Sequence, residues 1–390
     1  MDYSSLLSKK VVDMKPSGIR KFFDILETMK DVISLTVGQP DFVTPWHIRS
    51  AAIESLEQGK TYYTSNSGTK ELRDEIASYS KRRFDLEYDP KDEIIVTVGG
   101  SEAIDVAIRT IVGPGDEVIV PIPSFVCYGP LVEMAGGVPV FCPTREEDCF
   151  KLTPELLRPL INERTKLLVL PFPSNPTGAI MTREDLEGIA ELLRGTDIFV
   201  ISDEIYAELT YGRDHVSIAT LPGMRERTVV ASGFSKAYAM TGWRLGYTLA
   251  PREISKQMLK IHQYAIMCAP TTAQMAAIEA LRAGDPDVEE MCGEYDRRRK
   301  YLVHKLRKMG IECFEPEGAF YVFPNIKKFG MTSEEFAEKL LFDYGVAVVP
   351  GTAFGDCGEG FVRISYAYSI KHIDAALDRI EKMKNDYAVK

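Results

Sequence analysis

The sequence predicts an α/β protein with a mostly parallel sheet between helices, joined to a smaller α+β part. Two observations support this prediction. Between about residues 71 and 203, short runs that are apolar on both faces alternate with helix-like stretches. Such alternation is typical of parallel strands that helices cover on both faces. After about residue 285, a long charged helix precedes a mixture of strands and helices, which indicates a second structural unit.

The elements of the larger unit follow one another along the chain. Residues 71–84 have the apolar spacing of an amphipathic helix. The next strand, 94–98, is followed by a turn at Gly99 and Gly100 and then by a helix that begins near Ser101. Further buried strands are expected at 117–120, 138–141, 166–170, 197–201 and 228–231.

The smaller unit begins after the Asp285-Pro286 dipeptide, which we interpret as a hinge region. We expect a large domain at 45–285 and a small domain made of 1–44 and 286–390. An N-terminal helix at 17–29 has no sheet of its own and is expected to pack against the small domain. The other elements expected there are helices at 288–308, 333–344 and 370–384 and strands at 319–323 and 361–365.

The composition restricts the class of partner. The chain has 390 residues and a net charge of −10, from 47 basic and 57 acidic residues. Nucleic acids and anionic membranes favour basic surfaces, so neither is expected as a partner. No apolar run approaches the roughly 20 residues that span a bilayer, and the N-terminus lacks the layout of a secretion signal. We therefore expect a cytoplasmic protein.

Cysteine and histidine usage gives no support to a metal site or a disulfide framework. The seven cysteines form no C-x-x-C pair, and their number is odd. Free thiols in a reducing compartment fit this pattern better than a disulfide-bonded protein or a zinc site. The five histidines are isolated from one another. No metal is therefore expected to take part in catalysis.

Lys236 and Arg244 form the most informative pair in the sequence. Lys236 lies between small residues just after the apolar run 228–231, so it is expected at a strand exit rather than on a solvated face. There it can lose its proton and attack a carbonyl as a Schiff-base nucleophile. Arg244 offers a planar fork suited to a phosphate. A reactive lysine beside a phosphate-binding arginine suggests pyridoxal phosphate.

Asp203 ends the expected strand that contains residues 197–201. Ligands of open α/β sheets bind outside the carboxyl ends of the strands. A partly buried carboxylate at this place needs a cationic partner, and a protonated pyridine nitrogen would supply one. The alternative is a helix N-cap, which is common for aspartate at a strand exit and is favoured when this residue is considered alone.

Other residues have both a structural and a functional interpretation. Asn175 lies in Asn-Pro-Thr-Gly, which is ordinary turn chemistry, but its amide and the Tyr206 hydroxyl can also donate to a phenolic oxygen. The backbone N–H groups of residues 100–102 open a helix and can hold a phosphate. Phe125 is expected to pack in the core or to stack on a planar ring.

In combination, these motifs are specific. Asn-Pro-Thr-Gly, then Asp-Glu-Ile-Tyr, then Ser-Lys-x-x-x-x-x-Gly-Trp-Arg occur in this order. The chain thereby resembles the class I pyridoxal-phosphate aminotransferases of fold type I. The resemblance extends from residues 38–42 to residues 361–365. It implies a seven-stranded sheet in the large domain, pyridoxal phosphate as cofactor, and transamination between an amino acid and a 2-oxo acid.

The resemblance also implies roles for single residues. It implies that Lys236 binds the cofactor covalently and moves the substrate's α-proton, and that Asp203 pairs with the ring nitrogen. Arg363 is implied to bind the substrate's α-carboxylate, next to the backbone of Gly38. The remaining implied cofactor contacts are Asn175 and Tyr206 at the phenolic oxygen, and Gly100, Ser101, Glu102 and Arg244 at the phosphate. Tyr63 would reach the phosphate in the neighbouring subunit, which implies a homodimer.

Two positions depart from the family pattern. Family members often have tryptophan where this chain has Phe125, and phenylalanine can still stack on the ring. Many members also have a phosphate-contacting serine three residues before the lysine, where this chain has Gly233. Ser235 is the candidate to supply that hydroxyl instead.

The sequence does not identify the substrate side chain. Arg20, Tyr128 and Tyr264 are candidates for the side-chain pocket, although surface charge or ordinary packing explains each of them as well. Residues 17–22 and 260–264 resemble the bacterial branch of aspartate, aromatic and N-acetyl-LL-diaminopimelate aminotransferases. That resemblance implies 2-oxoglutarate as acceptor. A carbon–sulfur β-lyase is the alternative on the same scaffold, and a non-catalytic pyridoxal-phosphate-binding regulator is less favoured.

Overall fold

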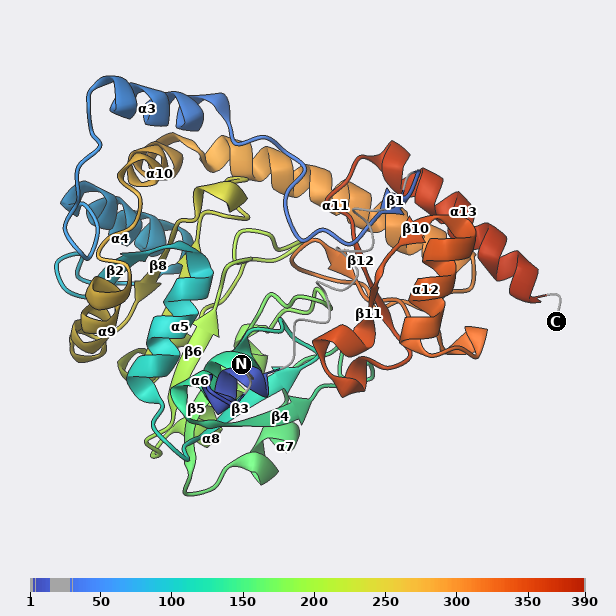
Figure 1. The fold of residues 1–390 in the computed structure, drawn as a ribbon, viewed down its shortest axis with the longest axis horizontal. Helices are drawn as coiled ribbons and strands as arrows, with labels where there is room; N and C mark the ends of the chain where they lie inside the picture. The colour runs from blue at the N-terminus through green and yellow to red at the C-terminus, as the bar shows by residue number, and fades with distance from the viewer. Residues whose placement is uncertain (1–2, 4, 15–28, 30, 389–390) are drawn as a thin grey trace.

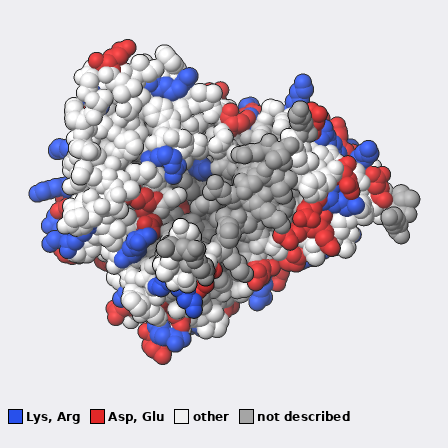
Figure 2. Space-filling model, in the orientation of Figure 1, with Lys and Arg blue, Asp and Glu red and all other residues white. Residues whose placement is uncertain are grey.

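The computed structural model describes residues 3, 5–14, 29 and 31–388. The helix expected at 17–29 therefore falls almost entirely outside the described residues, as does the candidate pocket residue Arg20. Within the described part, no helix is both long and apolar enough to cross a membrane. Residues of both charge signs are interspersed on the face drawn in Figure 2.

The larger sheet is mostly parallel, as the sequence predicts. Within the described residues its seven strands are β2 (Ile94–Thr97), β3 (Glu117–Ile122), β4 (Val138–Pro143), β5 (Thr165–Leu170), β6 (Phe199–Asp203), β7 (Thr228–Gly233) and β8 (Gly246–Leu249). Their spatial order is β2-β8-β7-β6-β5-β3-β4. The pairs from β4 to β7 are parallel, whereas β8 is antiparallel to both of its neighbours. The sequence did not predict β8.

Helices cover both faces of this sheet (Figure 1). Successive strand residues point to opposite faces, so Ile95 and Val229 belong to one core and Ile94 and Val230 to another. The first face is covered by α5 (Gly99–Ile111), α6 (Tyr128–Ala135) and α9 (Arg252–Ala265). The opposite face is covered by α4 (Lys70–Phe84), α8 (Arg183–Leu193) and α10 (Thr271–Ala283). Shorter or peripheral helices are α1 (Lys9–Val12), α3 (Trp46–Glu57) and α7 (Pro154–Leu157).

A second group of elements packs beside the larger sheet. Its antiparallel sheet has the order β11-β12-β9, and β1 pairs with β10 in parallel. The strands are β1 (Ile33–Ser34), β9 (Tyr321–Val322), β10 (Val346–Ala347), β11 (Val349–Pro350) and β12 (Val362–Ser365). The helices are α11 (Asp285–Lys308), α12 (Ser333–Tyr344) and α13 (Ile370–Ala388).

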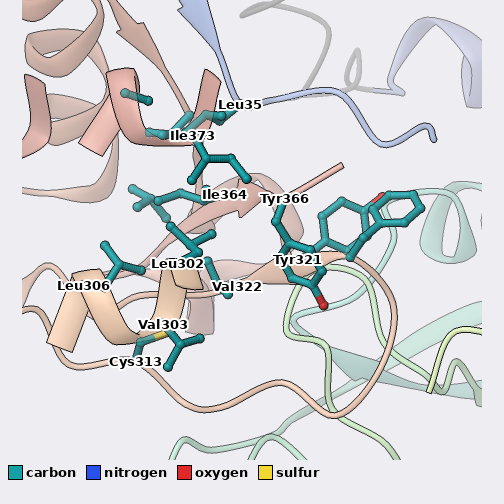
Figure 3. Packing of buried hydrophobic residues seen from close by; sticks show 14 of the residues in the cluster. Leu35, Leu302, Val303, Leu306, Cys313, Tyr321, Val322, Ile364, Tyr366 and Ile373 are labelled. Carbon is teal, nitrogen blue, oxygen red and sulfur yellow. The ribbon is translucent and has the colours of Figure 1, made fainter. Parts of the chain in front are cut away.

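These elements share one hydrophobic core (Figure 3). Leu302 of α11, Val322 of β9, Ile364 of β12 and Ile373 of α13 are all buried in it. Leu35, which follows β1, joins the same cluster, so the segment after residue 31 packs with the C-terminal elements. The dipeptide that we interpreted as a hinge forms the first turn of α11, where proline is tolerated because the first N–H groups of a helix have no helical partner.

Candidate active site

The largest group of predicted site residues surrounds one cavity of about 370 Å³. It lies at the carboxyl ends of β5, β6 and β7 and at the start of α5, and β9 and β12 contribute the opposite wall. This is the edge of an α/β sheet at which ligands are expected. The predicted residues that line it are Gly38, Gly100, Ser101, Phe125, Asn175, Asp203, Tyr206, Ser235, Lys236, Arg244 and Arg363.

Among the described residues that line the cavity, Lys236 is the only lysine. Its Nζ donates a hydrogen bond to the Gly38 carbonyl at 2.5 Å. Burial lowers the pKa of Lys236 to about 8, and the positive charges of Arg363 and Arg244 act in the same direction. The unprotonated amine, which a nucleophile or a general base requires, is therefore a minor form at neutral pH and about half of the population near pH 8.

Asp203 is buried at the end of β6. Its Oδ2 accepts a hydrogen bond from the Tyr128 hydroxyl at 2.7 Å, and its Oδ1 accepts one from the backbone N–H of Ile205 at 3.2 Å. No helix begins directly after Asp203 in the described chain, so the second bond is a turn contact and not the helix cap considered as the alternative. The carboxyl group also lines the cavity. Burial raises the pKa of Asp203. A cation bound in the cavity would favour its ionised form.

Arg363 lies in β12, on the opposite wall. Its guanidinium donates to the Asn175 side-chain oxygen at 2.8 Å and to the Thr36 carbonyl at 2.6 Å. It lies over the rings of Tyr321 and Phe354, at 4.5 and 4.9 Å from their centroids. Its buried Nε has no hydrogen-bond partner within the described chain. These are neutral partners, so the guanidinium remains available to an anion such as a carboxylate.

Asn175 and Tyr206 lie between these two charged groups. Because the Asn175 oxygen accepts from Arg363, its amide nitrogen is the part left to donate to a ligand. The Tyr206 hydroxyl lies 2.8 Å from the hydroxyl of Tyr321, which also lines the cavity. Burial raises the pKa of Tyr206 well above its ordinary value, so this phenol is protonated at neutral pH.

The first turn of α5 forms another part of the cavity wall. Gly100 and Ser101 line it, and helix N-termini present free N–H groups and a positive dipole end to anions. Arg244 and Ser235 line the cavity as well. A Cβ at Gly233 would lie 2.9 Å from both the Gly246 Cα and the Leu245 carbonyl oxygen, so the backbone leaves no room for a serine there.

Three predicted residues do not line the cavity. The side chain of Glu102 turns away and accepts hydrogen bonds from the Val98 N–H and from buried His262, both at 2.5 Å. Only its backbone can therefore serve an anion at the start of α5. Tyr63 is 79% exposed, and Tyr264 is 88% exposed. Both tyrosines are available to a neighbouring subunit rather than to this cavity.

The sequence analysis did not predict the contacts that two cavity residues make with the catalytic groups. Tyr128 was considered only as a side-chain pocket residue, and Tyr321 was treated only as part of a strand. The one sequence signal for Tyr128 is its place three residues after Phe125, at the start of α6. No local pattern distinguishes Tyr321 from the other aromatic residues of its core.

The residues present fit pyridoxal phosphate. A buried carboxyl group can face the ring nitrogen, a helix N-terminus and Arg244 can hold the phosphate, and a deprotonated lysine can bind the aldehyde. Asp203 forms no salt bridge with any described residue and is therefore available to a cationic ring. Together with the α/β fold, this cavity defines a pyridoxal-phosphate enzyme.

Comparison with known sequences identifies the family. The model of the family "Aminotransferase class I and II" matches residues 30–380. The chain therefore belongs to this family, is an aminotransferase, and uses pyridoxal phosphate. The fold is fold type I, as the sequence predicts.

Relatives named for different substrates match nearly the whole chain. The putative aminotransferase YugH of Bacillus subtilis is 55% identical, over 97% of this chain and 98% of the relative. A probable N-acetyl-LL-diaminopimelate aminotransferase of Bacillus subtilis is 48% identical, over 96% and 95%. An aspartate aminotransferase of Pyrococcus abyssi is 47% identical, over 97% and 98%.

Solved structures of similar proteins have the same fold as this chain. A crystal structure titled as Pyrococcus protein-A1 is 45% identical, covers 98% of this chain and 99% of its own, and superposes with a TM-score of 0.96. The aromatic aminotransferase from Pyrococcus horikoshii is also 45% identical, covers 95% and 100%, and superposes with a TM-score of 0.90.

Proposed function

We propose that this aminotransferase transfers the α-amino group of an L-amino acid to 2-oxoglutarate, with Lys236 as its central catalytic residue. The observation that supports this most is the convergence of Lys236, Asp203 and Arg363 on one cavity. Pyridoxal phosphate, when bound, supplies an electron sink for the carbanion at the substrate's α-carbon. The amine of Lys236 binds the cofactor and, once displaced by substrate, takes the proton from that carbon.

The other residues of the cavity position the cofactor and the substrate or stabilise their charges. Asp203 keeps the ring nitrogen protonated, and Tyr128 holds the Asp203 carboxylate in place through its hydrogen bond. Arg363 binds the substrate α-carboxylate and so fixes the direction of the Cα–H bond. Asn175 holds Arg363 with its oxygen and donates its amide N–H to the cofactor's phenolic oxygen, which Tyr206 also reaches.

The phosphate is proposed to bind at the start of α5. The backbone N–H groups of residues 100–102 and the hydroxyl of Ser101 face it, together with Arg244 and Ser235. Phe125 would stack on the cofactor ring, and its own ring packs edge-to-face on Tyr128, with 6.3 Å between the ring centroids. The Gly38 backbone lies beside the substrate.

The donor is proposed to be aspartate, an aromatic amino acid or N-acetyl-LL-diaminopimelate. Relatives and solved structures with these three names match the chain along nearly its whole length, which is why we keep all three. Purified holoenzyme should be assayed with 2-oxoglutarate and each donor separately. Glutamate formation with one donor at a kcat/KM at least tenfold above the others would identify it, and absence of glutamate with every donor would contradict the proposal.

The same assay separates transamination from β-elimination. A carbon–sulfur lyase releases pyruvate and ammonia from cystathionine without an oxo-acid acceptor. We expect no pyruvate when 2-oxoglutarate is omitted. Acceptor-independent pyruvate at a rate equal to glutamate formation would favour the lyase instead.

We also propose a homodimer with shared active sites. Large exposed apolar side chains support it, among them Trp46, Ile53 and Leu56 on α3. The surface drawn over α3 in Figure 2 has few charged residues. Tyr63, also highly exposed, would reach the cofactor phosphate of the other subunit. Sedimentation velocity at micromolar concentration should give about twice the chain mass of 43.7 kDa; a single species of one chain mass would contradict this.

Two further expectations remain proposals. The large domain is proposed at 45–285 and the small domain at 1–44 and 286–390; the separate hydrophobic core around α11, α12 and α13 supports that division. The protein is proposed to be cytoplasmic. All seven cysteines are free, which fits a reducing compartment.

A further inference from the structure

Tyr321, in the cavity wall, contacts three groups of the site that belong to separate parts of the chain. Its hydroxyl lies 2.8 Å from that of Tyr206, and its ring lies 4.5 Å from the guanidinium carbon of Arg363. A Cβ added at Gly38 would lie only 2.6 Å from the Tyr321 hydroxyl. The backbone at Gly38 therefore passes directly over that hydroxyl. Tyr321 is 1% exposed, so these contacts fix its position.

The number of protons available to the two phenols restricts how they can act. Burial raises the pKa of both Tyr206 and Tyr321, so each keeps its proton at neutral pH. Each phenol has one proton to donate. Since the two hydroxyls bond to each other, one of these protons is used between them and only one remains for a third group. If Tyr206 donates to the cofactor, Tyr321 must be the donor to Tyr206.

We propose that Tyr321 is a positioning residue with two separable parts: its hydroxyl orients and strengthens Tyr206 as a donor to the cofactor's phenolic oxygen, and its ring supports Arg363 for the substrate carboxylate. The inference rests on the proposed roles of Tyr206 and Arg363. In a chain of hydrogen bonds, a donor that itself accepts a bond is a stronger donor. A guanidinium over an aromatic face is attracted by the ring and held in plane.

The two parts predict different effects for different substitutions. Tyr321→Phe removes the hydroxyl and keeps the ring below Arg363. With pyridoxal phosphate bound, the hydroxyl of Tyr206 would stabilise the charged phenolic oxygen, and loss of that stabilisation would make the oxygen more basic. We therefore expect the pH midpoint of the holoenzyme's absorbance change to rise by about half a unit, while the amino-acid KM stays within about twofold.

Tyr321→Leu removes both parts. We expect the same rise of the absorbance midpoint as in Tyr321→Phe and, in addition, a rise of the amino-acid KM of about fivefold or more, since Arg363 loses one of its two aromatic supports. Equal KM values in the Phe and Leu variants would overturn the role of the ring.

A double-mutant cycle tests whether the hydroxyl acts through Tyr206. Tyr206→Phe alone should raise the midpoint by more than Tyr321→Phe does. The double variant should match Tyr206→Phe, because without Tyr206 the Tyr321 hydroxyl no longer influences the cofactor. Additive shifts, or an unchanged midpoint in Tyr321→Phe, would overturn the proposal.

A matched control isolates the effect of position. Tyr366 is buried in the same core and donates to the Ala319 carbonyl at 3.0 Å, but it does not line the cavity. Tyr366→Phe should leave the midpoint unchanged, and a shift equal to that of Tyr321→Phe would mean that general loosening of the core causes both. Failure of the proposed function is visible separately: Lys236→Ala would then retain the titrating absorbance of the wild-type protein.

Discussion

The two ends of the cavity contain buried charged groups of opposite sign, and each is held by neutral partners. Asp203 is 8% exposed and accepts hydrogen bonds from Tyr128 and a backbone N–H. Arg363 is 3% exposed and donates to Asn175 and a backbone carbonyl. Neither forms a salt bridge with any described residue. Burial raises the pKa of Asp203 and lowers that of Arg363, so burial acts against the charged form of each group.

The difference between the ends lies in which ligand supplies the missing charge. We propose that a protonated ring nitrogen supplies it at the Asp203 end and that a substrate carboxylate supplies it at the Arg363 end. Isolated buried charges are costly, and most folds avoid them. Under this proposal the cost is offset when cofactor and substrate are bound, which would make both charges selective for those ligands. The Lys236 amine lies near both and is sensitive to each.

Substitution of Lys236 tests whether the two ends serve one reaction. We expect Lys236→Ala to reduce turnover by at least about 10⁴-fold, because it removes both the nucleophile and the general base. Steady-state kinetics with the identified donor measures this, and circular dichroism confirms folding. A variant that keeps near-normal rates would disprove the assignment of Lys236.

Substitution of Asp203 tests the cofactor end. Asp203→Asn keeps the shape and removes the charge, so kcat should fall by about 10²- to 10³-fold with little change in the amino-acid KM. Asp203→Glu, which keeps the charge, should retain more activity than the Asn variant. If the Asn variant keeps its kcat, the carboxylate does not support the ring nitrogen.

Substitution of Arg363 tests the substrate end. Arg363→Ala should lower kcat/KM for amino and oxo acids by about 10²-fold, mainly through a higher KM. Arg363→Lys should be intermediate, because a point charge replaces a planar fork. Cofactor affinity, measured by fluorescence titration, should change little. An unchanged KM would contradict the role of Arg363.

The pH dependence of cofactor attachment compares how the charges of Asp203 and Arg363 affect the pKa of Lys236. Because the pKa of Lys236 is lowered to about 8, attachment to cofactor-free protein should accelerate about tenfold per pH unit below 8 and level off above it. Removing the positive charge in Arg363→Ala should move this midpoint up, and removing the negative charge in Asp203→Asn should move it down. Stopped-flow absorbance measures the rates; shifts of the same sign in both variants would refute the comparison.

Loss of the Tyr128 hydroxyl should have the smallest effect. Tyr128→Phe removes one hydrogen bond to Asp203, which should lower kcat by about three- to tenfold. That bond lowers the pKa of Asp203, so its loss should move the acid limb of the pH–rate profile to higher pH. Tyr79→Phe is the matched control, because Tyr79 is buried and donates to Glu208 away from the cavity. If the acid limb moves equally in both variants, the Tyr128 hydroxyl has no specific effect on Asp203.

Much of the fold and site was predictable because strand exits concentrate polar residues at one sheet edge. The predicted strands appear within a few residues of their expected bounds, and Asp203 and Lys236 meet at one cavity. The four-residue strand β8 was missed because a short run beginning with glycine has no periodicity to recognise. Its antiparallel pairing depends on contacts with β2 and β7, which no local pattern encodes.

The aromatic residues of the site were the least predictable part. Tyr321 lies in a strand that was expected, but its neighbours Tyr206 and Arg363 are 115 and 42 positions away. Whether such a tyrosine packs in the core or lines a cavity depends on these distant contacts. Tyr63 and Arg20 stay predictions, since the first concerns a neighbouring subunit and the second lies outside the described residues.

The tight backbone contact at Gly233 restricts how this enzyme can change its sequence. The serine that many family members have at this place cannot be introduced by one replacement, because the Cβ would meet backbone atoms of the next strand. Strand β8 would have to move first, and that movement would disturb its pairing with β2. We therefore expect laboratory evolution from this sequence to keep glycine at position 233, with Ser235 as the proposed source of a hydroxyl for the phosphate.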